Sequence, residues 1–190
     1  MKKYIAIVAA VLCLFASQNG MAREISGYGA RGIIALPSGN LSNVAGTGIG
    51  GIGTLLYEFD DNLVFSGSVG FISMGSKEVA SSVFFSELNW DYSYKIIPIT
   101  TGARYYLKPE GEGLRPYVGG DIGYYIYSVS VEDANGVSVG SVSGTSNFGI
   151  APAVGFQMGI LDVQANYSLA DFNYLGLSVG VMLGKKQVQN

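Results

Sequence analysis

Seven polar or charged residues of the 190-residue chain lie in stretches where apolar and small or polar residues alternate, and each belongs to the less apolar set. They are Arg31, Glu58, Arg104, Asp121, Asp162, Gln164 and Asn166. Because successive side chains of a strand point to opposite faces, this pattern predicts that all seven share an enclosed polar face. A buried charge must be paired, so we predict a plug of salt bridges and hydrogen bonds, with Arg104 and Asp121 as a pair on neighbouring strands. A gated pore or a proton-linked site is the alternative use of these residues.

The residue types of the chain give little support for an enzyme active site. Histidine is absent, which removes the commonest general base and the commonest transition-metal ligand. The single cysteine, Cys13, lies in a segment that we expect to be cleaved off, so neither a disulfide nor a thiolate metal site is expected. A serine activated by a lysine or a carboxylate is the remaining alternative, but on their predicted inner face Ser66 and Ser68 have only glycine and valine neighbours. We expect no enzyme activity, no catalytic or metal-binding residue and no cofactor.

Two short motifs have plainer explanations than ligand binding. The sequence from Gly46 to Gly51 contains G-x-G-x-x-G, but no helical pattern follows it, as dinucleotide binding would require. The run Asp60-Asp61-Asn62 offers too few oxygens for calcium and fits a hairpin turn. The formal net charge of −3, without basic clusters, argues against a nucleic-acid partner.

The N-terminal segment has the organisation of a secretory signal peptide. Lys2 and Lys3 precede an apolar run, and small residues at Gly20 and Ala22 fit a signal peptidase site. The run is too short to cross a bilayer as a helix, which takes roughly 20 residues. We therefore predict a signal peptide over residues 1–22 and one domain over residues 23–190.

The remaining chain is apolar without containing a long apolar run. Only 13% of all residues are charged, against about 25% in an ordinary soluble domain, and glycine occurs 28 times. The apolar residues instead alternate with polar or small ones in eight segments. These are Ser26–Ala35, Ile49–Phe59, Leu63–Ile72, Leu88–Leu107, Arg115–Val131, Phe148–Met158, Leu161–Leu169 and Leu175–Leu183. Such alternation predicts strands with one apolar and one polar face.

A sheet that faces lipid must close on itself, because an open edge would leave backbone groups unpaired at several kcal/mol each. The sequence thus predicts an all-β fold, an eight-stranded antiparallel up-and-down transmembrane β-barrel. The segment Leu88–Leu107 changes the parity of its apolar residues, which predicts a bulge near Ile97 and Pro98. Long connections at residues 37–47, 75–87 and 132–146 are expected outside the cell, with both termini in the periplasm.

Several short motifs resemble the outer membrane protein β-barrel domain family, which is porin-like and includes small eight-stranded barrels. They are Ile97-Pro98-Ile99, Gly102-Ala103-Arg104-Tyr105-Tyr106, Arg115-Pro116-Tyr117-Val118-Gly119, Gly123-Tyr124 and Pro37-Ser38-Gly39-Asn40. The resemblance spans nearly all of residues 23–190 and rests on structural rather than catalytic motifs. Many such barrels end in an aromatic residue that the assembly machinery reads, whereas here the last strand ends at Leu183 and the chain continues to Asn190.

The resemblance and the pattern together imply a protein of the cell outer membrane of a Gram-negative bacterium. The expected partners are outer-membrane lipid, lipopolysaccharide and the barrel assembly machinery, with an unspecified extracellular partner for the loops. The leading hypothesis for the function is a structural or surface-interaction role. A narrow porin-like channel or transporter and a loop-mediated adhesin are the alternatives within the membrane. A secreted soluble barrel with an apolar cavity is the alternative outside it, and it would require the two faces to be reversed.

Overall fold

The computed structural model describes residues 25–43, 45–76, 91–108, 113–132, 138–142 and 146–184. The predicted signal peptide, residues 1–22, lies outside them. No helix within these ranges is long and apolar enough to cross a membrane. The elements are β1 (Ile25–Pro37), η1 (Gly39–Asn43), β2 (Ala45–Glu58), β3 (Leu63–Ser76), β4 (Asp91–Tyr106), β5 (Leu114–Glu132), β6 (Ser138–Val142), β7 (Ser146–Met158), β8 (Leu161–Ser168) and β9 (Tyr174–Gly184).

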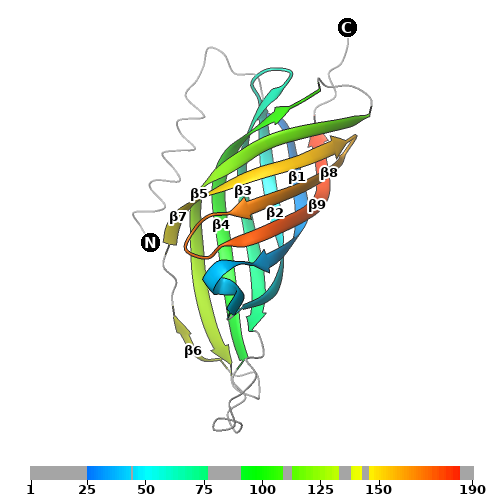
Figure 1. Ribbon diagram of the computed structural model, residues 1–190. Helices are drawn as coiled ribbons and strands as arrows, with labels where there is room; N and C mark the ends of the chain where they lie inside the picture. The colour runs from blue at the N-terminus through cyan, green and yellow to red at the C-terminus, as the bar shows by residue number, and fades with distance from the viewer. Residues whose placement is uncertain are drawn as a thin grey trace.

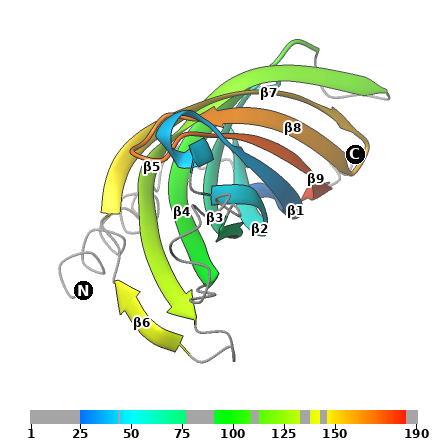
Figure 2. The same ribbon diagram turned by 60° about the horizontal axis from the view of Figure 1, so that its bottom comes forward.

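Eight of these strands form a closed antiparallel barrel (Figures 1 and 2). Their order is β4-β3-β2-β1-β9-β8-β7-β5, and β4 also pairs with β5, which closes the sheet. The first and last strands meet along a continuous register from Gly27↔Gly184 to Pro37↔Tyr174. The predicted eight-stranded up-and-down barrel is therefore confirmed.

The two ends of the barrel differ in their connections. At one end, which we call the loop end, lie η1 and residues 169–173. At the other, the turn end, short connections at residues 59–62 and 159–160 join β2 to β3 and β7 to β8. The remaining strand, β6, stands outside the barrel, and among the described strands it pairs with the tip of β5 alone, at the loop end. It falls in the connection that the sequence analysis left without a strand, residues 132–146.

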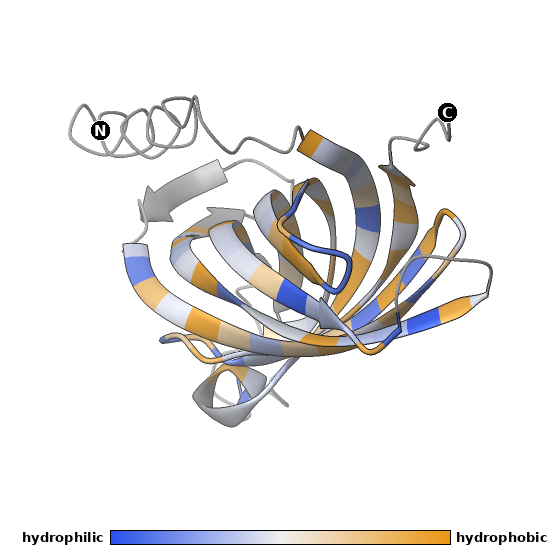
Figure 3. Cartoon of the chain, turned by 90° about the horizontal axis from the view of Figure 1, so that it is seen from above, coloured by the Kyte–Doolittle hydropathy of each residue, from blue (hydrophilic) through white to orange (hydrophobic). Residues whose placement is uncertain are grey.

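Figure 3 shows bands of alternating hydropathy along the strands, and the alternation of buried and exposed residues confirms the predicted faces. In β9 the outward side chains are 37–54% exposed, while Ser178 and Met182 between them are buried. The outward set comprises Leu175, Leu177, Val179, Val181 and Leu183. In β8 the carboxylate of Asp162 and the amide of Gln164 point inward. The faces are thus those of a membrane barrel and are not reversed.

Several glycines on the inner face are required by crowding in the lumen. A Cβ at Gly180 would overlap the backbone oxygen of Ala30, and one at Gly123 would overlap that of Ile99. By contrast, a Cβ at the outward-facing Gly67 would meet nothing within 4 Å. Inner glycines therefore allow neighbouring strands to coil closely around a narrow interior, while outer ones have no such role.

The bulge predicted near Ile97 and Pro98 is wrong. β4 keeps one register with β5 from Asp91↔Glu132 to Tyr106↔Tyr117, and the same register with β3 on both sides of Pro98. Ile96 is accordingly buried inside, while Ile99 points outward. Ile96 belongs to an apolar cluster at the loop end, against which Tyr94 packs. The change of parity in the sequence therefore marks a change in what the inner face contacts, and the strand itself does not slip.

Crowding on the inner face predicts different outcomes for an inner and an outer glycine substitution. Gly180→Ala should lower the free energy of unfolding by about 1–3 kcal/mol, because its Cβ enters occupied space. Gly67→Ala should change it by less than about 0.5 kcal/mol. Unfolding in urea, followed by the heat-dependent shift of the folded barrel on a detergent gel, measures both. Equal effects of the two variants would contradict the packing argument.

Candidate functional site: the lumen

The centre of the lumen holds one carboxylate between two guanidinium groups. Asp162 of β8 is fully buried. Its Oδ2 lies 3.6 Å from Nη1 of Arg31 on β1, and its Oδ1 lies 3.3 Å from Nη1 of Arg104 on β4. Both arginines are 5% exposed. A single anion thus ties together strands from opposite parts of the sheet order.

Hydrogen bonds from two further side chains complete this charge cluster. Arg104 Nη2 donates to Gln164 Oε1 at 3.2 Å, and Arg31 Nη1 donates to the same oxygen. The Tyr117 hydroxyl lies 3.1 Å from Asp162 Oδ1, to which it donates, and its ring centroid is 4.9 Å from the Arg104 guanidinium carbon. We define the charge cluster as Arg31, Arg104, Asp162, Gln164 and Tyr117. Tyr117 is not among the seven residues predicted from the sequence, although its shared parity with Asp121 marks it as inward-facing.

The predicted pair of Arg104 with Asp121 is replaced by the pair of Arg104 with Asp162. Asp121 stands opposite Gly102 in the register, one inward position further toward the loop end than Arg104. Its carboxylate accepts a long hydrogen bond of 3.4 Å from Ser66 Oγ. The prediction assumed that neighbouring strands supply the partner, whereas in a barrel this narrow the partner reaches across the lumen.

The remaining two predicted residues lie beside the charge cluster. Asn166 of β8 lines a small cavity next to Arg31 and Gln164. Glu58 is partly buried at the end of β2 and stands in one cross-strand row with Val64 and Arg104. Among the described residues, no group of three or more His, Cys, Asp or Glu side chains is arranged to hold a metal ion.

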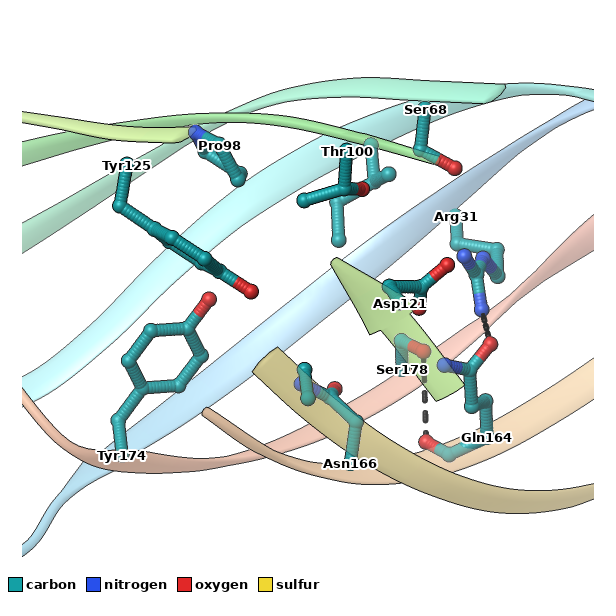
Figure 4. A pocket seen from close by; sticks show the side chains of 12 residues that line it. Arg31, Ser68, Pro98, Thr100, Asp121, Tyr125, Gln164, Asn166, Tyr174 and Ser178 are labelled. Carbon is teal, nitrogen blue, oxygen red and sulfur yellow. Dashed lines mark hydrogen bonds between the residues drawn. The ribbon is translucent and has the colours of Figure 1, made fainter. Parts of the chain in front are cut away.

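The cavity has a volume of about 30 Å³, which suits a few water molecules rather than a larger solute. In Figure 4, Arg31 and Asp121 lie at one side of it, and the hydroxyls of Tyr125 and Tyr174 point toward one another at the other. It is lined by Arg31, Ile52, Ser68, Pro98, Thr100, Asp121, Tyr125, Ala151, Gln164, Asn166, Tyr174 and Ser178. The polar middle of the lumen is therefore nearly filled by its own side chains.

An apolar layer seals the lumen at the loop end. It consists of Ile33, Ala35, Leu41, Ala45, Ile72, Met74, Ile96, Tyr125, Tyr127 and Tyr174. Leu41 comes from η1 and is only 3% exposed, so the β1–β2 connection folds into the barrel mouth. The Ser38 amide donates to the Asn173 carbonyl at 2.9 Å, and Phe172 packs edge-on against Tyr127 with ring centroids 4.6 Å apart. These contacts bind the two capping connections to each other and to the wall.

A second apolar layer seals the turn end. It consists of Leu56, Val64, Tyr106, Tyr117 and Met182. The Tyr106 hydroxyl donates to Gln157 Oε1 at 2.9 Å, and the Arg115 guanidinium carbon lies 4.0 Å from the centroid of the Tyr106 ring. The Arg115 side chain also donates to the backbone oxygens of Lys108 and Asp61 at 3.3 and 3.2 Å. The charge cluster is thus enclosed from both ends.

Comparison with known proteins identifies the family to which this architecture belongs. The sequence matches the outer membrane protein beta-barrel domain over residues 6–187. The chain belongs to this family. No curated protein sequence matches it. As an outer membrane protein beta-barrel domain, the chain has lipid around its wall, which explains an outward surface far more apolar than a soluble protein tolerates.

Solved structures of small outer-membrane barrels are similar to this chain. Neisserial surface protein A aligns with a TM-score of 0.50 and 18% identity, covering 84% of this chain and 96% of that one. Ail of Yersinia pestis aligns with a TM-score of 0.49 and 17% identity, covering 83% and 97%. The N-terminal barrel of Pseudomonas aeruginosa OprF aligns with a TM-score of 0.47 and 14% identity, covering 84% and 98%.

The shared carboxylate predicts a strong dependence of the barrel on Asp162. Asp162→Asn leaves two buried guanidinium groups without their common anion, which should lower the free energy of unfolding by about 3–5 kcal/mol. Asp61→Asn, at an exposed turn, should change it by less than about 0.5 kcal/mol. Urea unfolding in detergent measures both variants. A loss below 1 kcal/mol for Asp162→Asn, taken as about the limit of an exposed pair, would show that the cluster carries little of the stability.

Proposed function

We propose that this outer-membrane barrel is non-conducting and non-enzymatic and has a structural or surface-interaction role, its lumen plugged by polar and charged side chains. The observation that carries the proposal is the order of layers along the lumen. Apolar clusters close both ends, and the charge cluster fills the space between them. An eight-stranded barrel is just wide enough for side chains to fill its interior, so no path for solutes is left by default.

The loop end offers the surface on which a partner would act. β4 has 16 residues and β5 has 19, whereas about 9–11 suffice to span a membrane. The pairing of β5 with β7 stops at Ile126↔Ser146, and β5 continues to Glu132 with β6 on its free edge. In Figure 1 these strands extend beyond η1 toward β6. We call β6 and the ends of β4 and β5 beyond η1 the projecting sheet.

The orientation in the membrane follows from the same proposal. Short turns are typical of the periplasmic side and longer connections of the external side. The loop end then faces outward, and the projecting sheet stands above the outer leaflet. Residues 1–22 would direct export and be removed, and the barrel assembly machinery would insert the barrel. A channel for small solutes would need the layers of the lumen to move apart.

Electrical recording tests the closed lumen. The purified barrel in a planar lipid bilayer should add no conductance steps above those of the bare bilayer. Leu41→Gly should also give none, because the charge cluster and the turn-end layer remain in place. Steady conductance of the unmodified protein, increased by Arg104→Ala or Asp121→Ala, would overturn the proposal in favour of the channel alternative.

A deletion tests the surface role. Removal of Ser138–Val142 takes away β6, which among the described strands pairs with β5 alone, and should leave the barrel closed and heat-shiftable on a gel. We expect bacteria carrying this variant to lose most attachment to host cells or to one another, while the unmodified protein supports it. If attachment is unchanged and outer-membrane leakiness is also unchanged, neither the surface role nor the structural role of this sheet stands.

A further inference from the structure

The outward faces of the strands carry almost no charge. Among the described side chains of β1 to β5 and β7 to β9, Lys95 is the one charged group that points away from the lumen. It shares its parity in β4 with the exposed Ile99, and the buried Ile96 lies on the opposite face. No carboxylate among the described residues lies within ion-pair distance of it. With no counter-charge in the described part of the chain, an anion of the surrounding membrane is the candidate partner of this cation.

Two hydroxyl groups flank Lys95 on the same face. Lys95 stands directly opposite Ser73 of β3 and directly opposite Ser128 of β5. Directly paired side chains in antiparallel strands have Cβ atoms about 4.5–5.5 Å apart. Ser73, Lys95 and Ser128 therefore form one polar row across three strands, which we call the lysine row.

The lysine row lies at the upper border of the apolar belt. Toward the turn end, the next row contains Ile97 opposite Ile126, and the one below it contains Ile99 opposite Tyr124. Ile99 and Tyr124 are 36% and 47% exposed, so this part of the wall offers contact to acyl chains. At the level of the lysine row the inner face instead becomes apolar, with Ile96 in the loop-end cluster. Below this level the outer face of the strand is apolar and the inner face is polar, whereas at this level the outer face is polar and the inner face is apolar. Such a change is expected where the hydrocarbon of the membrane ends and the headgroups begin.

We propose that the lysine row binds a phosphate of a glycolipid in the outer leaflet, the lipid A part of lipopolysaccharide, with the acyl chains lying on the rows below. The proposal rests on the proposed outward orientation of the loop end. An ammonium group supplies three donors and a point charge, and two serine hydroxyls add neutral donors, which together match the oxygens of a phosphate monoester. A cation near an anionic membrane surface contributes about 1 kcal/mol, and the hydroxyls add specificity for position.

Lipid titration in solution tests the lysine row. The folded barrel in zwitterionic micelles is titrated with diphosphoryl lipid A while backbone amide shifts are followed by NMR. We expect the amides of Ser73, Lys95 and Ser128 to shift together. Lys95→Met should weaken the apparent affinity about fivefold, while the double variant Ser73→Ala, Ser128→Ala should weaken it about twofold. Lys108→Met, at the exposed turn end, is the matched control and should change nothing.

Three outcomes would overturn the assignment. Equal binding of lipid A without phosphates would leave only apolar contact with the wall. Inorganic phosphate shifting the same amides at the same concentration would show a general phosphate site without a lipid requirement. An unchanged affinity of Lys95→Met would remove the cation from the site. In each case the heat-dependent gel shift and the bilayer recordings report separately on the closed barrel, so failure of this site is distinguishable from failure of the proposed function.

Discussion

The structure depends on one constraint, which is that hydrocarbon offers no hydrogen-bond partner to a peptide group. Every backbone donor and acceptor of a spanning sheet must therefore be satisfied within the sheet, and only closure achieves this. The pairing of β1 with β9 and of β4 with β5 removes both edges. Closure with eight strands also fixes the width of the interior, which explains why Gly123 and Gly180 have no room for a side chain.

The narrow interior in turn determines how its polar groups are satisfied. Asp162 lies between Arg31 and Arg104 because a lumen this narrow brings facing walls within side-chain reach. Apolar layers on both sides keep bulk water away, so the interaction inside is strong and the loss of one partner is costly. In the closed barrel that we propose, the side chains that stabilise the structure also exclude solutes. Stability and impermeability would then have a common cause.

The features that were predicted correctly depend on periodicity within one strand. Those that were not predicted depend on contacts between strands that are distant in the sequence. The inward parity of Arg31, Asp162 and Gln164 follows from alternation alone, because each residue's face depends only on its own strand. The partner of Arg104 does not follow, since it comes from β8, which no adjacency in the sequence indicates. β6 was missed because its residues carry no clear alternation, and its pairing depends on how far β5 extends past β7.

The wrongly predicted bulge shows that an alternating pattern of apolar residues depends on what covers each face of the strand along its length. Tyr94 and Ile96 have the parity of inward side chains, and Ile97 and Ile99 have that of outward ones, although all are apolar. If each face of the strand contacted one medium along its whole length, both sets of apolar residues could share a face only after a one-residue slip in register. The strand crosses a boundary instead: below it lipid covers the outer face, and above it η1 and Phe172 cover the inner face. Lys95 lies between these two regions. We therefore place the membrane surface at the level where the alternation inverts, and an anionic headgroup there would pair with Lys95, which has no ion-pair partner among the described residues.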